Sequence, residues 1–334
     1  MAPARNAWLQ LTSEPPVEPS LPICDPHHHF WDRPEERYLV EELLQDVRGG
    51  HHIVSTVLIE CRERWRKDGP EAMRPVGETE FVERIVGPSG MHGETAVAAG
   101  IVGFADLSVG AAVAPVLEAH LAASPKRFRG IRHSCTWDAS PAAKTATPGI
   151  PPGLMLDGRF RAGLACLHRY GLSFEAWLYH PQLPEFAALA RAVPAVPMIL
   201  NHVGGLLGVG PYAGKRDEVF QVWKRGIAEV ATCPNVVVKL GGLGMVRCGF
   251  DWHTRPTPPD STALMQATAP YYLYCIEQFG PNRCMFESNF PVDKISCAYG
   301  VLWNSFKRMT KDFSPAERAA LFHDTAARAY RLGS

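Results

Sequence analysis

The chain has 334 residues, of which 46% are hydrophobic and 20% are charged, and its 34 basic residues balance its 34 acidic ones. This composition is that of a globular protein long enough to bury one large core or two small ones. The balanced charge gives no electrostatic reason to expect nucleic acid or an anionic membrane as a partner. No window approaches the roughly 18 consecutive apolar residues that a membrane-spanning helix needs.

Residues 1–20 contain Pro and Glu and lack the basic flank and apolar core of a signal peptide. We expect a flexible N-terminal arm there, followed by a single domain over residues 21–334. The nine cysteines are scattered singly and form no C-x-x-C pair. This pattern favours a reducing cytoplasm over a disulfide framework or a structural zinc finger.

Short apolar or β-branched runs alternate with segments of helical periodicity along the chain. The expected strands cover residues 22–29, 53–61, 97–105, 128–135, 172–180, 197–202, 235–241 and 283–289. The expected helices cover residues 78–86, 113–123, 160–170, 184–193, 217–232, 271–279, 299–309 and 315–332. This alternation predicts parallel strands joined by right-handed crossovers. Eight such units predict a single-domain (β/α)8 TIM barrel with its site at the C-terminal ends of the strands.

A doubly wound open sheet is the rival fold. It usually has a glycine-rich turn after an early strand, and the chain contains neither a G-x-G-x-x-G nor a Walker sequence. We therefore prefer the barrel.

The first expected strand ends in the run DPHHHFWD at residues 25–32. Side chains alternate between the two faces of a strand, so His27 and His29 point the same way and His28 points the opposite way. Two imidazoles on one face at the end of a buried strand form half of a metal site or of a paired acid/base site.

Other polar side chains also fall at the ends of the expected strands. The candidate substrate-binding residues are Arg132, Arg129, Glu60, His133 and Trp31. An arginine can hold a substrate carboxylate in a bidentate clamp, and Arg132 is the better candidate. An equally simple alternative is a salt bridge between Arg132 and either Glu60 or Asp106 at the barrel mouth.

Residues 23–332 resemble the amidohydrolase superfamily, in particular the amidohydrolase 2 family. That family includes 2-pyrone-4,6-dicarboxylate lactonase, sugar-acid lactonases and, more distantly, aminocarboxymuconate-semialdehyde decarboxylase. The resemblance is carried by DPHHHFWD at 25–32, IE at 59–60, GETEF at 77–81, FRGIRH at 128–133, HPQL at 180–183, NHVG at 201–204 and ESNFPV at 287–292. It implies a (β/α)8 barrel with its site at the strand ends.

The resemblance also implies roles for individual histidines. His27 and His29 would be the pair on strand one, and His202 would polarise the substrate carbonyl or act as a base. His180 is similar to a strand-five histidine that ligates metal in the decarboxylase branch. The resemblance thus implies one divalent metal ion, zinc or manganese, held by His27, His29 and His180. A metal-free mode, in which His202 and the arginines carry the chemistry, is the alternative.

One residue departs from the family pattern. Asn289 stands where the family has its strand-eight aspartate, and an amide cannot accept a proton as a general base. Glu287 shares the inward face of Asn289 by the two-residue period of a strand, and Asp293 lies just past the strand end. Either carboxylate could be the base, or Asn289 could orient a water or a substrate carbonyl. We favour Glu287, for which a structural salt bridge to Lys239 is the alternative.

Three functions remain open at this point. The first is a hydrolase that opens a lactone or similar cyclic ester of a small carboxylic acid. The second is a metal-dependent, non-oxidative decarboxylase of an aromatic or muconate-type acid, and the third is a non-catalytic barrel that binds small molecules. Barrels of this kind are often dimers, so a homodimer is also open.

Overall fold

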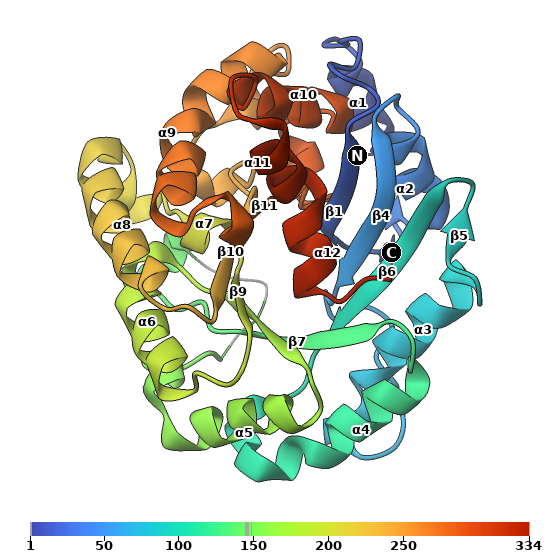
Figure 1. Ribbon diagram of the computed structural model, residues 1–334, viewed down its shortest axis with the longest axis vertical. Coiled ribbons are helices and arrows are strands. Elements are labelled where there is room, and N and C mark those ends of the chain that lie inside the picture. Colours follow the sequence, from blue (N-terminus) through green and yellow to red (C-terminus); the bar gives the residue numbers. More distant parts are fainter. Residues whose placement is uncertain (1, 144–146, 148, 334) are drawn as a thin grey trace.

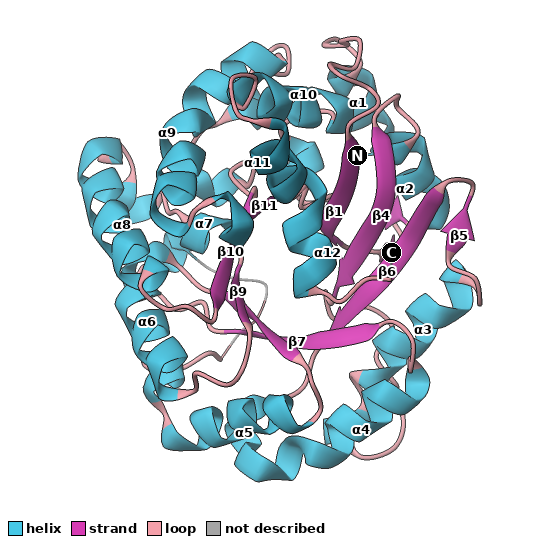
Figure 2. Cartoon of the chain, viewed as in Figure 1, coloured by secondary structure: helices cyan, strands magenta, loops and turns pink. Residues whose placement is uncertain are grey.

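The computed structural model describes residues 2–143, 147 and 149–333. Parallel strands form the inner wall of a barrel, and helices surround it on the outside (Figures 1 and 2). The strands of the wall, in spatial order, are β1 (Pro22–His28), β4 (His52–Ile59), β6 (Thr95–Gly103), β7 (Phe128–Ser134), β8 (Ser173–Trp177), β9 (Met198–Leu200), β10 (Val236–Leu240) and β11 (Cys284–Phe286). The order follows the sequence, as expected for a (β/α)8 barrel.

All eight expected strands are present, and each pairs in parallel with its neighbour in the sequence of strands. The chain after β11, the last strand, is hydrogen-bonded to the end of β1, the first strand. The backbone N–H of His29 donates to the carbonyl of Phe290 over 2.8 Å, and that of Asn289 donates to the carbonyl of His27 over 2.9 Å. The barrel therefore closes at His27, His29 and Asn289, which are candidate site residues from the sequence.

Most expected helices overlap helices of the structure, although the one expected over residues 271–279 is only the second half of a helix that begins at Ser261. These helices are α3 (Val76–Val86), α4 (Ala114–Ala123), α5 (Gly158–Arg169), α6 (Leu183–Ala192), α8 (Arg216–Ala231), α9 (Ser261–Phe279) and α10 (Tyr299–Met309). The helix expected over residues 315–332 is divided into α11 (Pro315–Ala319), a π-helical turn (Ala320–Asp324) and α12 (Thr325–Ala329).

Several short elements were not expected from the sequence. They are α1 (Ala2–Leu9), α2 (Val40–Val47), α7 (His202–Gly205), the hairpin of β2 (Trp31–Arg33) and β3 (Glu36–Tyr38), and β5 (Met91–His92). Most are too short to show a clear period, whereas the buried Val40, Leu43 and Val47 of α2 do recur at helical spacing, so this helix could have been predicted from the sequence. These elements form part of the loops around the barrel.

The N-terminal segment before β1 is attached to the barrel by hydrogen bonds. Thr12 Oγ1 donates to the carbonyl of Pro258 over 2.8 Å, and Glu14 accepts from the backbone N–H of Ser261 over 2.7 Å. The backbone N–H of Val17 donates to Asn304 Oδ1 over 2.7 Å. The flexible arm predicted for residues 1–20 thus contains a helix and several contacts with the barrel, and its flexibility stays a prediction.

The barrel interior changes from apolar to polar along its axis. An apolar cluster that includes Cys24, Val57 and Met285 fills the lower part, together with Tyr330 from the C-terminal segment. Above it lies the buried ion pair of Lys239 Nζ with Glu175 Oε2, 2.9 Å apart. A buried charge is stable only with a partner of opposite charge, and this pair marks the start of the polar layer that leads to the barrel mouth.

Two further observations concern the whole described chain. None of its helices combines the length and the apolar character needed to cross a membrane. Each of the nine cysteines lies within the described residues and is free.

The packing of α5 generates a first prediction. A Cβ atom at Gly163 would lie 2.1 Å from the carbonyl oxygen of Leu107, which is far below contact distance. Because backbone cannot move aside as a flexible side chain does, we expect Gly163→Ala to lower the free energy of unfolding by about 1–3 kcal/mol or more. Gly158→Ala is the matched control on the same helix, since a Cβ there meets no atom within 4 Å. Denaturant titrations of both variants measure the difference, and equal stabilities would contradict this packing.

Candidate active site

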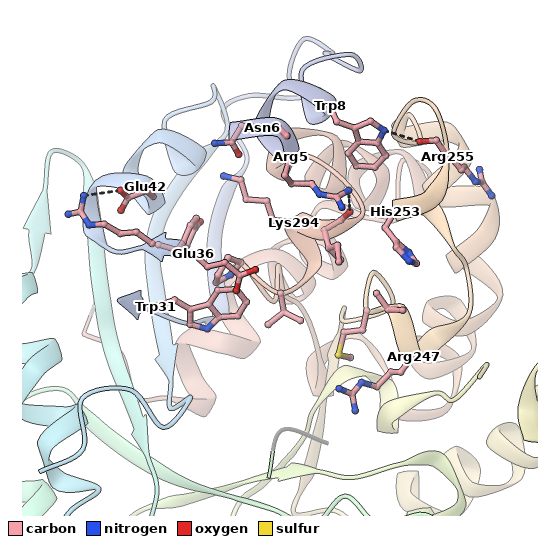
Figure 3. Close-up of a pocket in the computed structure, with 18 of the residues that line it drawn as sticks. Arg5, Asn6, Trp8, Trp31, Glu36, Glu42, Arg247, His253, Arg255 and Lys294 are labelled. Atoms are coloured by element: carbon pink, nitrogen blue, oxygen red, sulfur yellow. Dashed lines mark hydrogen bonds and ion pairs between the residues drawn. The ribbon is translucent and has the colours of Figure 1, made fainter. Parts of the chain in front are cut away.

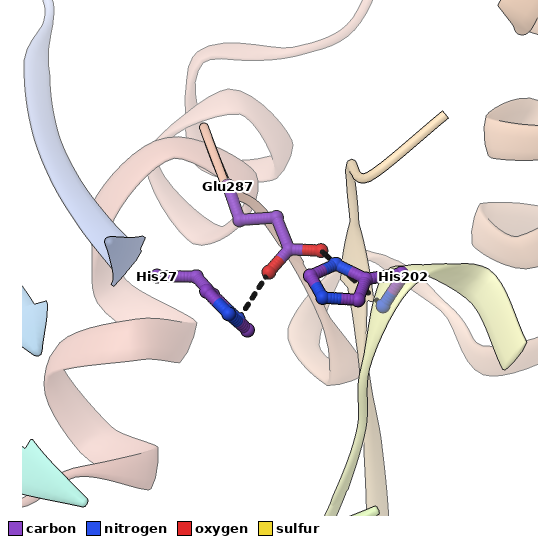
Figure 4. Close-up of side chains that lie close together, drawn as sticks. All are labelled: His27, His202 and Glu287. Atoms are coloured by element: carbon purple, nitrogen blue, oxygen red, sulfur yellow. Dashed lines mark hydrogen bonds and ion pairs between the residues drawn. The ribbon is translucent and has the colours of Figure 1, made fainter. Parts of the chain in front are cut away.

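Three buried side chains from distant parts of the chain meet inside the barrel mouth. His27 lies on β1. His202 comes after Asn201, the residue that follows β9, and Glu287 directly follows β11. Glu287 Oε2 lies 2.9 Å from His27 Nδ1, and Glu287 Oε1 lies 2.6 Å from His202 Nδ1. Figure 4 shows the carboxylate between the two rings, with one oxygen directed at each. Glu287 is completely buried and His202 is only 3% exposed.

The backbone around His202 is bent to place its ring. His202 and Val203 have φ angles of 53° and 47°, in the left-handed region that L-residues rarely occupy. The backbone N–H of His202 donates to Glu287 Oε1 over 3.2 Å, and Trp223 Nε1 donates to the carbonyl of Val203 over 2.7 Å. At Gly242 a Cβ atom would lie 2.5 Å from the His202 ring. The surroundings therefore hold this strained turn in one conformation.

His29 contributes a second imidazole to the cluster. Its Nε2 lies 3.3 Å from His27 Nε2, and its Nδ1 lies 2.7 Å from the carbonyl oxygen of Ile59. Because a carbonyl only accepts, Nδ1 of His29 must carry the hydrogen and donate it. Nε2 of the neutral ring therefore holds a lone pair that faces His27.

The tautomer of His27 depends on what its Nε2 binds. Around its Nδ1 lie one acceptor, Glu287 Oε2, and two donors, Lys239 Nζ and Asn201 Nδ2, each 3.2 Å away. When Nε2 donates to His29, Nδ1 accepts from Lys239 and Asn201. When Nε2 gives its lone pair to an electrophile, Nδ1 carries the hydrogen and Glu287 is the acceptor within reach. The structure thus provides partners for both tautomers.

Burial sets the charge of these groups. It lowers the pKa of His27, His29 and His202 well below the usual value, so the three imidazoles are neutral at physiological pH. Burial raises the pKa of Glu287 to about 8, against the opposing effect of the positive charge of Lys239. A carboxyl group bonded to Nδ1 of a neutral imidazole can fix which ring nitrogen carries the hydrogen.

The cluster fits a divalent metal ion. Two imidazole nitrogens bound tetrahedrally to zinc lie about 3.4 Å apart, and Nε2 of His27 and Nε2 of His29 are 3.3 Å apart. Metal-binding histidines usually donate their other N–H to a carbonyl or carboxylate. The carbonyl of Ile59 accepts from His29, and Glu287 Oε2 lies 2.9 Å from His27 Nδ1. Within the described residues, donor atoms of His27, His202 and Glu287 also lie within 4.8 Å of one another.

Four other predicted residues lie in pairs at the mouth. Arg132 Nε donates to Glu60 Oε1 over 2.7 Å, so the salt bridge considered as the alternative to a substrate clamp is present. Asn289 Nδ2 donates to Asp293 Oδ1 over 2.8 Å. Burial raises the pKa of Asp293 to about 8, although hydrogen bonds from Gly244 and Asn289 act in the opposite direction. Trp31 belongs to the wall of a cavity outside the cluster.

Three predicted residues are not brought to the cluster. His180 Nδ1 accepts from the backbone N–H of Leu207 over 3.3 Å, and its ring packs against Tyr212, so it is not placed as a third metal ligand beside His27 and His29. The reason is that β8 ends at Trp177, and the chain has turned into a short helix (His180–Gln182) when it reaches His180.

His133 lies on the outward face of β7, one residue from the inward-facing Arg132, whereas Arg129 lies at a register irregularity near the amino end of the strand. The ring of His133 packs edge-on against Phe160 of α5, and Arg129 donates to backbone carbonyls at the amino end of the strand. A role in substrate binding is therefore not supported for either residue.

Sequence reasoning missed several residues of the site. Trp177 contacts the His202 ring edge-on, with centroids 4.9 Å apart, and Asn201 and Glu175 continue the polar network below His27. The two-residue period of β8 could have placed Glu175 and Trp177 inside the barrel. The salt bridge between Glu287 and Lys239, considered as the structural alternative for Glu287, is not formed, because Lys239 pairs with Glu175.

The fold and this cluster define a barrel enzyme with buried histidines at the strand ends, and the comparisons with known proteins agree. The family model described as amidohydrolase matches residues 24–332. The chain belongs to the amidohydrolase family, in its amidohydrolase 2 branch, and is a hydrolase.

Two relatives and one solved structure illustrate the similarity. Uncharacterized protein y4mH of Sinorhizobium fredii is 34% identical over 93% of this chain and 99% of its own length. L-fucono-1,5-lactonase of Burkholderia multivorans is 28% identical over 70% of this chain and 72% of its own length. The crystal structure of an amidohydrolase from Burkholderia multivorans with bound zinc has a TM-score of 0.70 and 24% identity, over 93% of this chain and 99% of that chain. It shows the same fold.

The placement of the histidines predicts how metal content responds to mutation. We expect His29→Ala to reduce the affinity for added zinc at least about 100-fold, because it removes one of two facing nitrogens. His180→Ala is the matched control and should retain the wild-type affinity, because His180 contacts Leu207 and Tyr212 and, within the described residues, is not grouped with His27. Inductively coupled plasma mass spectrometry of chelator-washed and reloaded proteins measures the difference. Loss of metal from the His180 variant alone would contradict the site described here.

Proposed function

We propose that this hydrolase opens a lactone, the cyclic ester of a small hydroxy acid. The observation that carries the proposal is the pairing of His202 with the buried carboxylate of Glu287 beside two further neutral imidazoles. A histidine whose Nδ1–H is held by a carboxylate is the arrangement that hydrolytic enzymes use to activate a nucleophile. Relatives named as lactonases of L-fuconate and L-rhamnonate support the choice of a cyclic ester.

His202 and Glu287 have different roles in the hydrolysis. His202 Nε2 takes a proton from the attacking water and returns it to the ring oxygen that leaves as the alcohol, so that one water is consumed and one hydroxy acid is formed. Glu287 holds the tautomer of His202 that leaves Nε2 free, and it stabilises the imidazolium while the proton is on the ring. Glu287 is thus a positioning residue, because it is buried behind His202.

We propose zinc as the metal, held by Nε2 of His27 and Nε2 of His29. Imidazole donors suit zinc, whereas manganese prefers carboxylates and other oxygen ligands. When bound, the ion acts as a Lewis acid toward the ester carbonyl. Because His180 is not available as a third imidazole ligand, we expect weaker binding than at a catalytic zinc site with three protein ligands.

Decarboxylation is the less well supported reaction. Two features favoured it in the sequence, namely His180 as a metal ligand and the missing aspartate at Asn289. In the structure His180 Nδ1 accepts from the backbone N–H of Leu207, His180 is not grouped with His27 among the described residues, and the carboxyl group of Glu287 is bonded to His202. The third reading, a non-catalytic barrel, has no support once the chain is placed in a hydrolase family.

Hydrolysis is tested by titrating acid release in a pH-stat from a panel of 1,4- and 1,5-lactones that includes L-fucono-1,5-lactone. We expect His202→Ala to lower kcat about 10²–10⁴-fold, which is the contribution typical of a general base. The exposed His168 on α5 provides the control, and His168→Ala should keep full activity. Release of CO₂ from aromatic acids without any acid release from the panel would overturn the proposal.

A further inference from the structure

Two buried side chains at the barrel mouth, Asn289 and Asp293, take no part in the proton transfer assigned above to the histidine. Asn289 is 1% exposed and Asp293 is 2% exposed. The backbone N–H of Asn289 donates to the carbonyl of His27, and the backbone N–H of His29 donates to the carbonyl of Phe290. The backbone at Asn289 therefore lies directly beside the segment that carries His27 and His29.

Asp293 joins the loop after β11 to the loop after β10. Its Oδ1 accepts from Asn289 Nδ2 over 2.8 Å, and its Oδ2 accepts from the backbone N–H of Gly244 over 2.9 Å. A Cβ atom at Gly244 would lie 2.7 Å from Asp293 Oδ2, so this close approach leaves no room for a side chain. Ser296 Oγ also donates to the carbonyl of Gly244, over 2.6 Å. The two loops are thus bound to each other at Gly244.

The loop that Asp293 binds also packs on the pair of His202 and Glu287. A Cβ atom at Gly241 would lie 2.3 Å from Glu287 Cγ, and one at Gly242 would lie 2.5 Å from the His202 ring. Because a side chain at either position would collide with the pair, the loop backbone lies in direct contact with it. Asp293 binds the same loop two residues further on and is therefore placed beside the reacting groups.

The two loops also form part of the wall of a cavity at the barrel mouth (Figure 3). The loop after β10 contributes residues 245–247 to this wall, and the loop after β11 contributes residues 291–292 and 294–295. The cavity has a volume of about 840 Å³, which is within the range of roughly 300–1,000 Å³ that is typical of small-molecule sites. A lactone and the water that attacks it therefore have room beside these loops.

The N-terminal helix α1 connects the same two loops across the cavity. Arg5 Nη1 donates to the carbonyl of Ile295 over 2.9 Å, and Trp8 Nε1 donates to that of Arg255 over 3.0 Å (Figure 3). Asp293 binds the loops at a buried position. The loops are thus tied at two places, and the side chains on them are held in one arrangement.

The contact with Asp293 decides which atom of the Asn289 amide remains available. An ionised carboxylate only accepts hydrogen bonds, so it binds Nδ2 of the amide and leaves Oδ1 turned away from it. None of the described residues donates a hydrogen bond to Oδ1 of Asn289. Polar atoms of nearly buried side chains have hydrogen-bond partners as a rule. A molecule in the barrel mouth can supply the missing donor.

We propose that Asn289 Oδ1 accepts a hydrogen bond from the water that attacks the lactone, and that Asp293 is the positioning residue that turns this oxygen toward the water. The attacking water has two hydrogens. His202 Nε2 takes one of them as a proton, and Asn289 Oδ1 binds the other, which orients the water oxygen toward the ester carbonyl. No covalent bond beyond those of the hydrolysis is formed or broken. The inference rests on the proposed function, because it assigns a role within that reaction.

The first test is Asp293→Asn. The new amide keeps both contacts when its oxygen accepts from Gly244 and its nitrogen donates to Asn289 Oδ1, so the Asn289 amide turns around and presents Nδ2 to the water. We expect kcat to fall about tenfold or more with KM unchanged, because a donor now faces the water and one hydrogen bond is lost. A pH-stat measures both constants for the lactone of the panel that the wild type hydrolyses fastest. Denaturant titration should give a midpoint close to that of the wild type.

The second test exchanges the two groups in the double variant Asn289→Asp, Asp293→Asn. The carboxylate introduced at position 289 accepts from the amide at position 293 and presents its other oxygen to the water, so we expect the kcat lost in Asp293→Asn to be recovered. Asn289→Asp alone places two carboxylates against each other and should lower the denaturation midpoint, and the second substitution should restore it. Asn and Asp both tolerate the left-handed φ of 56° at this position.

Ser296→Ala is the matched control, because it removes a hydrogen bond to the same loop without touching Asn289. We expect it to keep the wild-type kcat, since Asp293 and α1 still connect the loops. Its purpose is to separate the orientation of the amide from a general loosening of the loops.

The outcomes distinguish this inference from the proposed function. Full kcat in Asp293→Asn, no recovery in the double variant, or an equal loss in Ser296→Ala would overturn the role of Asp293 while lactone hydrolysis stands. A rise in KM at unchanged kcat would overturn the assignment to the water. If the wild type hydrolyses no lactone of the panel, the proposed function fails, and the role of Asn289 in that reaction fails with it.

Discussion

The rest of the site depends on the contacts of the buried carboxylate of Glu287 with His27 and His202. A buried carboxylate without partners is strongly unfavourable, and the barrel supplies ring nitrogens on two sides and the charge of Lys239 nearby. Through these contacts one side chain controls two imidazoles. It sets the tautomer of His202, and it offers His27 the acceptor that His27 needs when its Nε2 binds an electrophile.

The polar interior continues below this contact as a connected network. Lys239 lies between His27 and Glu175, and Asn201 bonds to the same two residues. Tyr330 donates to Glu175 from the C-terminal segment, which closes the lower end of the barrel. Since the members of such a network orient one another, the position of the His27 ring depends on Glu175 of β8, on Asn201 just after β9, on Lys239 of β10 and on the end of the chain. The carboxylates and the lysine are therefore best understood as one unit.

Secondary-structure elements with a clear period of apolar residues were predicted correctly from the sequence in most cases. The eight strands, their parallel order and most helices follow from alternating patterns of apolar residues, which act locally. The same two-residue period correctly placed Glu287 on an inward face. It failed at His180 because the strand before it ends three residues earlier than expected, and a side chain beyond a strand end no longer follows the period. It also places His133 on the outer face of β7, although His133 was predicted as a substrate-binding residue at the end of that strand.

The sequence by itself determined the barrel, the amidohydrolase resemblance and the strand-end histidines, because these are properties of local patterns and of short motifs. Only the tertiary structure decided that Glu287 bonds to His202 and not to Lys239, and that the N-terminal segment lies across the barrel mouth. Both depend on contacts between residues far apart in the chain, Arg5 with Ile295 and His202 with Glu287. Such contacts are selected by the geometry of the closed barrel and leave no periodic signal in the sequence.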